Sequence, residues 1–274
     1  MQEHTHRQTD QEPAPPGPPP KRRRGIYLLP NLFTTAGLFA GFYAIVAAMK
    51  GDFEPAAVAI FVAMVMDSID GRVARITHTQ SDFGAEYDSL SDMVSFGIAP
   101  ALVIYAWALS SFGKLGWLAA FIYTAGAALR LARFNTQAEI ADKRYFQGLA
   151  SPAAAGILAG LVWVGHGYGW AGKPVFILAF VLTILISALM VSNIRYHSFK
   201  QLDLKGKIPF VSLLIIVLAF VLISSEPASV LFAIFLLYAV SGPAMTLLHL
   251  RKKRSQRKHP APPPPPPDSN GLEN

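Results

Sequence analysis

Long apolar stretches separated by short polar segments make up most of the chain. A helix needs about 17–25 apolar residues to cross the hydrocarbon core of a bilayer, and eight stretches approach or reach that length. They cover residues 32–49, 55–75, 88–111, 115–134, 149–169, 174–193, 208–224 and 227–249. The pattern therefore predicts an all-α polytopic membrane protein with about eight transmembrane helices.

The composition supports this class and indicates the domain limits. The chain has 274 residues, 52% of them hydrophobic and only 15% charged, and its mean hydropathy is +0.36. Both ends are polar and rich in proline, and such segments do not form a packed core. We expect a disordered basic and proline-rich tail over 1–24, a transmembrane domain that carries the chemistry over 25–249, and a second such tail over 250–274.

The basic residues predict the orientation of the helices. Of 24 lysines and arginines, only Lys50, Lys114 and Lys173 fall in connections on one side of the predicted membrane. The positive-inside rule places the richer side, and with it both termini, in the cytoplasm. Topology thus explains much of the net charge of +7, and the basic flanks also fit anionic lipid head groups. Nucleic acid is a poor alternative partner.

Four carboxylates interrupt the apolar pattern near the predicted cytoplasmic ends of the second and third stretches. At about 100° per residue, Asp67 and Asp70 lie about 60° apart on one helix face. Asp88 and Asp92 lie about 40° apart on the face of another helix. Each acid in a membrane helix costs ~2.5–3.5 kcal/mol on insertion scales, and four together repel one another. Two opposed acidic faces are therefore expected to hold cations.

The other residues of this segment indicate which ligand the cations accompany. Oxygen ligands favour Mg²⁺ or Mn²⁺, and a chain without cysteine or paired histidine ligands is a poor zinc site. Gly71 and Ala74 leave room on the acidic face, and Arg75 offers a planar guanidinium for phosphate. Together they predict a pyrophosphate site. The alternatives are hydrogen bonds between packed helices and a divalent-cation transporter, although all four acids gather near one membrane face.

The acidic segment also resembles a known family signature. Its spacing, D-x2-D-G-x2-A-R-x8-G-x3-D-x3-D, agrees at all eight fixed positions with the CDP-alcohol phosphotransferase family. The positions are Asp67, Asp70, Gly71, Ala74, Arg75, Gly84, Asp88 and Asp92. The phrases PNLFTTAGLFAGFYAI, FGAEYDSLSDMVSFGIAPALV and ALRLARFN resemble bacterial integral-membrane members whose acceptor alcohol is L-serine. The resemblance covers about Pro30 to Ser192.

This resemblance implies a reaction and a metal site. It implies transfer of the phosphatidyl group from CDP-diacylglycerol to the hydroxyl of L-serine, which gives phosphatidylserine and CMP. It also implies two divalent cations, Mg²⁺ or Mn²⁺, held by the carboxylates of Asp67, Asp70, Asp88 and Asp92. Asp92, the last acid of the signature, is expected to be the general base as well.

The resemblance further implies where the two substrates lie. The surface expected to hold the CDP part consists of Gly71, Ala74, Arg75 and Gly84. Asn31, at the start of the first helix, is either a helix cap or a further nucleotide contact. Three arginines lie at predicted cytoplasmic helix ends: Arg130, Arg133 and Arg195. They are expected either to form a cationic wall that binds the acceptor carboxylate or a lipid phosphate, or to extend to the membrane surface as snorkelling residues that set helix depth.

Family membership would also imply a homodimer in the bacterial inner membrane, with the active site on the cytoplasmic side. The acceptor identity depends on the more weakly matching phrases, so another alcohol remains an alternative. Glycerol 3-phosphate, choline and inositol phosphate are the candidates. A phosphorylated acceptor would require more guanidinium groups near the site than a zwitterion does.

Overall fold

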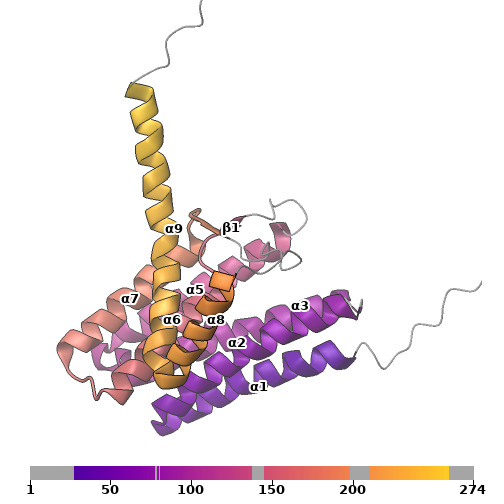
Figure 1. Cartoon of the computed structure of the whole chain (residues 1–274). Helices are drawn as coiled ribbons and strands as arrows, with labels where there is room; N and C mark the ends of the chain where they lie inside the picture. Colours follow the sequence, from indigo (N-terminus) through magenta and orange to yellow (C-terminus); the bar gives the residue numbers. More distant parts are fainter. Residues whose placement is uncertain (1–27, 78, 80, 138–144, 198–209, 259–274) are drawn as a thin grey trace, which may run out of the picture.

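The computed structural model describes residues 28–77, 79, 81–137, 145–197 and 210–258 (Figure 1). The helices are α1 (Leu28–Lys50), α2 (Phe53–Ile76), α3 (Asp82–Asp92), η1 (Met93–Ile98), α4 (Ala99–Trp107), η2 (Leu109–Phe112), α5 (Lys114–Gln137), α6 (Ser151–Gly167), α7 (Lys173–Val191), α8 (Phe210–Ser225) and α9 (Pro227–Lys258). Two short strands, β1 (Tyr145–Gln147) and β2 (Arg195–His197), pair antiparallel.

Each of the eight predicted stretches has a helical counterpart, with α3, η1 and α4 together forming the third. Within the described residues, five segments are long and apolar enough to cross a membrane: α1, the α3 to α4 segment, α5, α7 and α9. Of the other three, α6 and α8 have 17 and 16 residues, and α2 carries the charged motif. The protein is an all-α polytopic membrane protein.

Two element boundaries differ from the prediction. α1 begins at Leu28, so Asn31 lies inside the helix, and the capping alternative for this residue is wrong. Pro30 is tolerated there because the first helical turn has no intrahelical partner for a backbone N–H. α9 continues to Lys258, past the predicted end of the last apolar stretch at residue 249 and into the tail expected to begin at residue 250. The remaining parts of both tails lie outside the described residues.

Small side chains allow the helices that carry the site to pack closely. α1 and α2 run side by side (Figure 1), and buried alanines line both helices. They include Ala40, Ala44 and Ala47 of α1 and Ala56, Ala59 and Ala63 of α2. Lipid supplies no hydrophobic force between helices, so close backbone approach and van der Waals contact stabilise such pairs. α6 is largely buried among the other helices.

The third membrane segment changes its helical geometry directly after Asp92, where Met93–Ile98 form a π-helix. Pro100 has no backbone N–H to donate to the carbonyl of Phe96, four residues earlier, so the α-helical ladder cannot be completed here. The hydroxyl of Tyr123 in α5 donates to that carbonyl at 3.0 Å. This hydrogen bond holds the π-helix, which follows the acidic helix α3, against α5.

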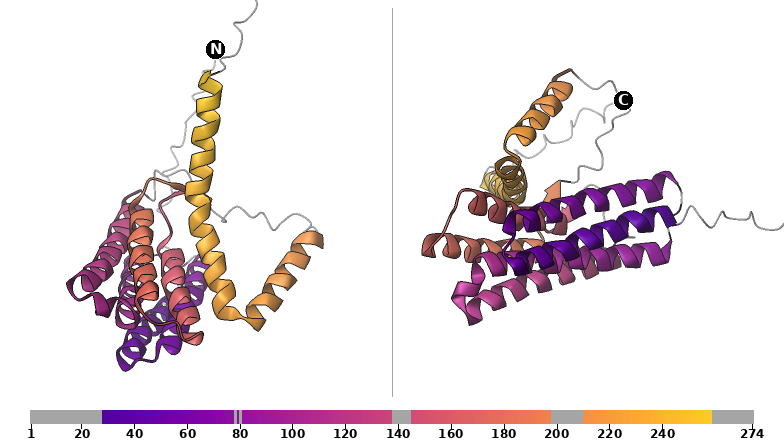
Figure 2. Two further views of the ribbon diagram at one scale, coloured as in Figure 1. Left: turned by 90° about the vertical axis from the view of Figure 1, so that its left-hand side faces the viewer. Right: turned by 90° about the horizontal axis from the view of Figure 1, so that it is seen from below.

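β1 lies in the connection between α5 and α6, and β2 lies in the connection between α7 and α8. Both connections are on the side of the membrane predicted to be cytoplasmic. Gly148, which follows β1, has a φ of 80°, and a Cβ there would lie 2.2 Å from the Met190 carbonyl oxygen. A glycine is therefore required at this turn into α6. The first turns of α6, which follow, are buried and consist mainly of small residues. α8 packs against α9 and stands apart from the other helices (Figure 2).

Candidate active site

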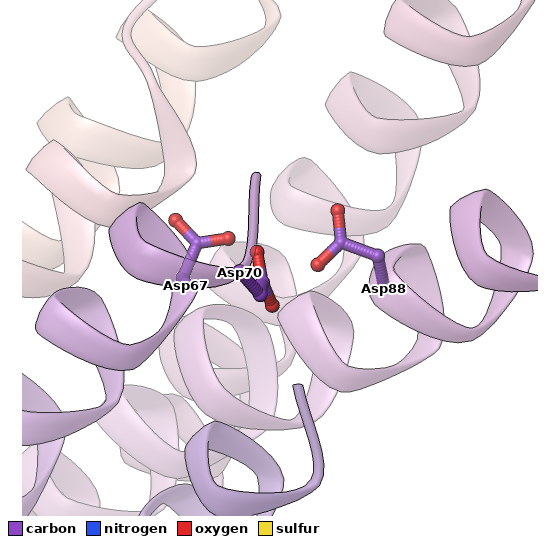
Figure 3. Close-up of side chains that lie close together, drawn as sticks. All are labelled: Asp67, Asp70 and Asp88. Atoms are coloured by element: carbon purple, nitrogen blue, oxygen red, sulfur yellow. The ribbon is translucent and has the colours of Figure 1, made fainter. Parts of the chain in front are cut away.

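Carboxylates from two helices meet at one place (Figure 3). Asp67 and Asp70 extend from α2 and Asp88 extends from α3, and one oxygen of each lies within 4.8 Å of the others. Asp70 is buried, and Asp67 and Asp88 are half-buried. The two acidic faces therefore oppose each other, as the helical spacing predicts.

Asp92 completes the acidic group from the next turn of α3. Its carboxyl is close enough to that of Asp67 to share a hydrogen bond, and all four acids line one small cavity. Asp92 also lies within electrostatic range of the Arg130 guanidinium of α5. This acid thus links the three-carboxylate cluster to the first of the predicted acceptor arginines.

Hydroxyl groups fix the relative positions of the helices that carry the acids. The Thr34 hydroxyl of α1 donates to Oδ2 of Asp70 at 2.9 Å. The buried Ser91 of α3 donates to the Thr34 carbonyl at 3.2 Å, and Ser95 of η1 donates to the Gly37 carbonyl at 3.2 Å. Neither serine was predicted to have this role, because the sequence of an apolar stretch does not show which partner a serine in it will bind. These hydrogen bonds to α1 therefore fix the positions of α2 and α3 relative to each other.

The donor set suits a hard divalent cation. Arg75 lies within electrostatic range of Asp70, and Arg130 within range of Asp92, but two guanidinium groups do not balance four carboxylates. Carboxylate oxygens are the ligands that Mg²⁺ and Mn²⁺ prefer. The acidic cluster can therefore hold a divalent cation.

A cleft of about 370 Å³ opens beside Asp70 and Asp88, which are among its lining residues. It is also lined by four of the five residues predicted to contact the CDP part, namely Asn31, Gly71, Ala74 and Gly84. The fifth, Arg75, lies over Gly71, where an added Cβ would be 3.5 Å from its Nη1. The structure brings all five together beside the acids.

Gly84 lies in the first turn of α3, close to Asn31 of α1. Ser81 caps α3, and its Oγ accepts a hydrogen bond from the Gly84 N–H at 3.1 Å. A Cβ on Gly84 would lie 3.1 Å from Ser81 Oγ and 3.5 Å from Asn31 Oδ1. An added Cβ would therefore crowd the Ser81 cap of α3 and make ordinary contact with Asn31 of α1.

The arginines predicted to bind the acceptor have different surroundings, and Arg130 is the one beside the acids. Its Nη1 donates to the buried Ser151 Oγ at 2.7 Å. Its Nε is buried and has no hydrogen-bond partner among the described residues. Such burial does not fit a side chain that extends to the membrane surface.

Arg133 is instead held by two neutral side chains. Its Nη2 donates to Oε1 of Gln147 and, at 2.7 Å, to Oδ1 of Asn193. Arg195 lies on β2, where its backbone is opposite Gln147, and its side chain lies outside the described part of the structure. The amide partners of Arg133 come from distant parts of the chain, and sequence analysis missed them.

Comparison with known proteins agrees with this site. The family model for CDP-alcohol phosphatidyltransferase matches residues 27–185. A curated Helicobacter pylori protein named CDP-diacylglycerol–serine O-phosphatidyltransferase is 36% identical over 215 residues, covering 78% of this chain and 90% of the relative. Two proteins of the same name come from Bacillus subtilis (33% identical, covering 63% of this chain and 92% of the relative) and Methanocaldococcus jannaschii (41%, covering 51% and 62%).

The family match contains every helix that contributes to the carboxylate cluster and to the cleft beside it. The match, the identity to the relatives and the opposed acidic faces of α2 and α3 lead to one assignment. The chain belongs to the CDP-alcohol phosphatidyltransferase family.

Proposed function

We infer that this protein is a CDP-diacylglycerol–serine O-phosphatidyltransferase, which transfers the phosphatidyl group to L-serine and releases CMP. The observation that carries the inference is the group of opposed carboxylates beside a cleft lined by the small residues of the signature. Relatives from bacteria and an archaeon share this enzyme name. A transporter is not favoured, since family membership and a cleft beside the acids both indicate transfer chemistry.

An acceptor panel tests this function. Purified protein with labelled CDP-diacylglycerol should form phosphatidylserine and CMP when L-serine is added. Glycerol 3-phosphate, choline and inositol phosphate should give little product. Product formation from one of these alcohols instead would keep the reaction class and overturn the acceptor. Loss of label only by hydrolysis would contradict the transferase assignment.

We propose that Asp67, Asp70, Asp88 and Asp92 hold two divalent cations, Mg²⁺ or Mn²⁺. When bound, these cations would neutralise charge on the pyrophosphate and on the departing CMP. The Thr34 hydroxyl donates a hydrogen bond to Asp70, and Ser91 links α3 to α1, so these contacts hold the acids in place. Preorganised ligands of this kind avoid reorganisation during the reaction.

The cleft beside the acids is the proposed site for the CDP part. Gly71, Ala74 and Gly84 present little side-chain bulk to it, so a nucleotide can approach the backbone closely. Asn31 offers an amide there, and Arg75 offers a guanidinium for phosphate. The acyl chains would remain in the surrounding lipid.

Asp92 is the proposed general base. It accepts the proton of the serine hydroxyl as the serine oxygen forms a bond to the phosphatidyl phosphorus. The bond between that phosphorus and the CMP oxygen breaks, and CMP leaves with the electron pair. The position of Asp92 beside both Asp67 and Arg130 supports this role. If the carboxylate of serine binds Arg130, the hydroxyl of the same serine molecule lies near Asp92.

Replacing Arg130 by Ala should raise the KM for L-serine by about 10-fold or more, with a much smaller change in the KM for CDP-diacylglycerol. Arg130 is the arginine of the acceptor wall that lies beside Asp92. Steady-state kinetics with each substrate varied in turn gives both constants.

Arg133→Ala is the matched control for this measurement. Arg133 already donates to Gln147 and Asn193, so its loss should reduce stability and affect both substrates alike. If Arg130→Ala also changed both KM values equally, the residue would be assigned to helix packing. A serine-specific defect in Arg195→Ala would move the carboxylate site to β2.

We further propose a homodimer in the bacterial inner membrane, with both termini and the active site in the cytoplasm. The basic tail and helix ends support this orientation through the positive-inside rule. Labelling of single cysteines placed near Lys50 and Arg75 would test it, since the chain has no cysteine of its own. Only the second should react with an impermeant reagent added from the cytoplasmic side.

A further inference from the structure

We infer that Tyr123 of α5 is a positioning residue for Asp92, acting through the π-helix η1. The inference rests on the proposed function, because it takes Asp92 to be the general base. Tyr123 is fully buried, and its hydroxyl donates to the Phe96 carbonyl of η1 at 3.0 Å. A residue outside the eight signature positions would thus set the direction of the last acid of the signature.

The π-helix forms part of the cavity that the acids line. Ser95 and Phe96 of η1 line this cavity together with Asp92 and the other three carboxylates. Asp92 is the last residue of α3 and directly precedes η1. A change in the geometry of η1 would therefore move both a wall of the cavity and the acid beside it.

The longer turn of the π-helix determines the direction in which α3 faces. The Ala99 N–H donates to the carbonyl of Val94, five residues earlier, whereas an α-helix pairs residues four apart. α4, which follows, has five buried residues that fix it in the bundle. If η1 changed to α-helical pairing while α4 stayed packed, α3 would rotate by about 100°, the angle of one residue. Asp92 would then turn away from Asp67 of α2.

Two neighbouring helices hold η1 in this geometry. On the side of α1, the Ser95 hydroxyl donates to the Gly37 carbonyl at 3.2 Å. On the side of α5, the Tyr123 hydroxyl makes its bond of 3.0 Å, and the Thr124 hydroxyl lies 3.5 Å from the Gly97 carbonyl. Tyr123 therefore makes the shorter of these two contacts from α5.

Pro100 explains why a hydroxyl is useful at position 123. Proline has no N–H, so in α-helical pairing the Phe96 carbonyl would have no donor from position 100. A buried carbonyl without a partner is costly. Tyr123 supplies a donor to this carbonyl in the π-helix, and it adds no charge beside the acids. Its hydroxyl therefore favours the geometry that directs Asp92 into the cavity.

The test is Tyr123→Phe, which removes the hydroxyl and keeps the ring. In the full chain, kcat should fall by about 10–100-fold because the base is misplaced, and the KM of each substrate should change by less than about twofold. Tyr196→Phe is the matched control, since Tyr196 is also fully buried and donates to the Ala239 carbonyl of α9 at 3.0 Å. It should lower thermal stability and leave kcat unchanged. Equal falls in kcat in the two variants would overturn the inference.

A second substitution separates the position of Asp92 from the stability of the helix. Pro100→Ala returns an N–H to position 100, which can donate to the Phe96 carbonyl in α-helical pairing. Added to Tyr123→Phe, it should restore thermal stability, while kcat stays low because Asp92 still faces the wrong way. Recovery of kcat together with stability would show that Tyr123 only satisfies a carbonyl, and would overturn the inference.

A double-mutant cycle tests whether Tyr123 acts through Asp92. In an Asp92→Asn background, Tyr123→Phe should have almost no further effect on kcat. Independent effects of the two substitutions would overturn the inference. So would a normal kcat in Tyr123→Phe while the wild type forms phosphatidylserine. If the wild type formed none from L-serine, the proposed function itself would fail, and this role of Tyr123 with it.

Discussion

Excess EDTA should abolish phosphatidylserine formation by the purified protein, and Mg²⁺ or Mn²⁺ should restore it. The nearest oxygens of Asp67, Asp70 and Asp88 lie within 4.8 Å of one another. Charges so close in an apolar surrounding repel strongly unless cations compensate them. The measurement is release of labelled CMP at saturating concentrations of both substrates, before and after the ion is returned.

The choice of ion provides the control for this experiment. Zn²⁺ should restore little activity, because the acidic cluster offers carboxylate oxygens and the chain has no cysteine. Binding of CDP-diacylglycerol should weaken in the chelated protein as well, since its pyrophosphate would then face uncompensated carboxylates. Full turnover in excess chelator would contradict the metal site.

Helical periodicity was sufficient to predict the arrangement of the acids. Asp67 and Asp70 share a face of α2 because three residues correspond to about 60° of helical rotation. Their approach to Asp88 was expected from the cost of isolated acids in a membrane, and the structure brings the three carboxylates together. Local spacing and one strong energetic penalty thus predicted most of the geometry of the acidic cluster.

Other features depend on contacts between distant residues, and periodicity carries no information about them. The π-helix after Asp92 reflects Pro100 together with a hydroxyl from α5, supplied by Tyr123. Arg130 and Arg133 looked equivalent in sequence, since both end the same apolar stretch. In the structure Arg130 donates to Ser151, and Arg133 donates to Asn193. Because these partners are distant in sequence, only the structure shows that the two arginines have different surroundings.

The position of α9 is a second example. Its apolar sequence predicts a membrane helix but not the face that packs on α6, because nearly every side of it is hydrophobic. The glycines at 156 and 160 determine that face by accepting aromatic rings. Pairing a glycine with a distant ring requires coordinates, so the packing of α9 on α6 was not predictable.

Asp92→Asn should lower kcat by about 10²–10⁴-fold, the usual loss when a general base is removed. The amide keeps the shape of the side chain and can still offer one oxygen to a cation, but it cannot take the serine proton. Asp92 differs from the three clustered acids in lying within electrostatic range of Arg130, on the acceptor side of the proposed site. Turnover should be measured together with metal titration and CDP-diacylglycerol binding.

Asp67→Asn is the comparison that separates the base from the metal ligands. Asp67 belongs to the three-carboxylate cluster and also approaches Asp92, so its loss removes charge from the centre of the metal site. This variant should lose metal affinity, and with it CDP-diacylglycerol binding, whereas Asp92→Asn should largely keep both. Equal loss of metal in the two variants, or near-normal turnover in Asp92→Asn, would reject Asp92 as the base and leave the enzyme class intact.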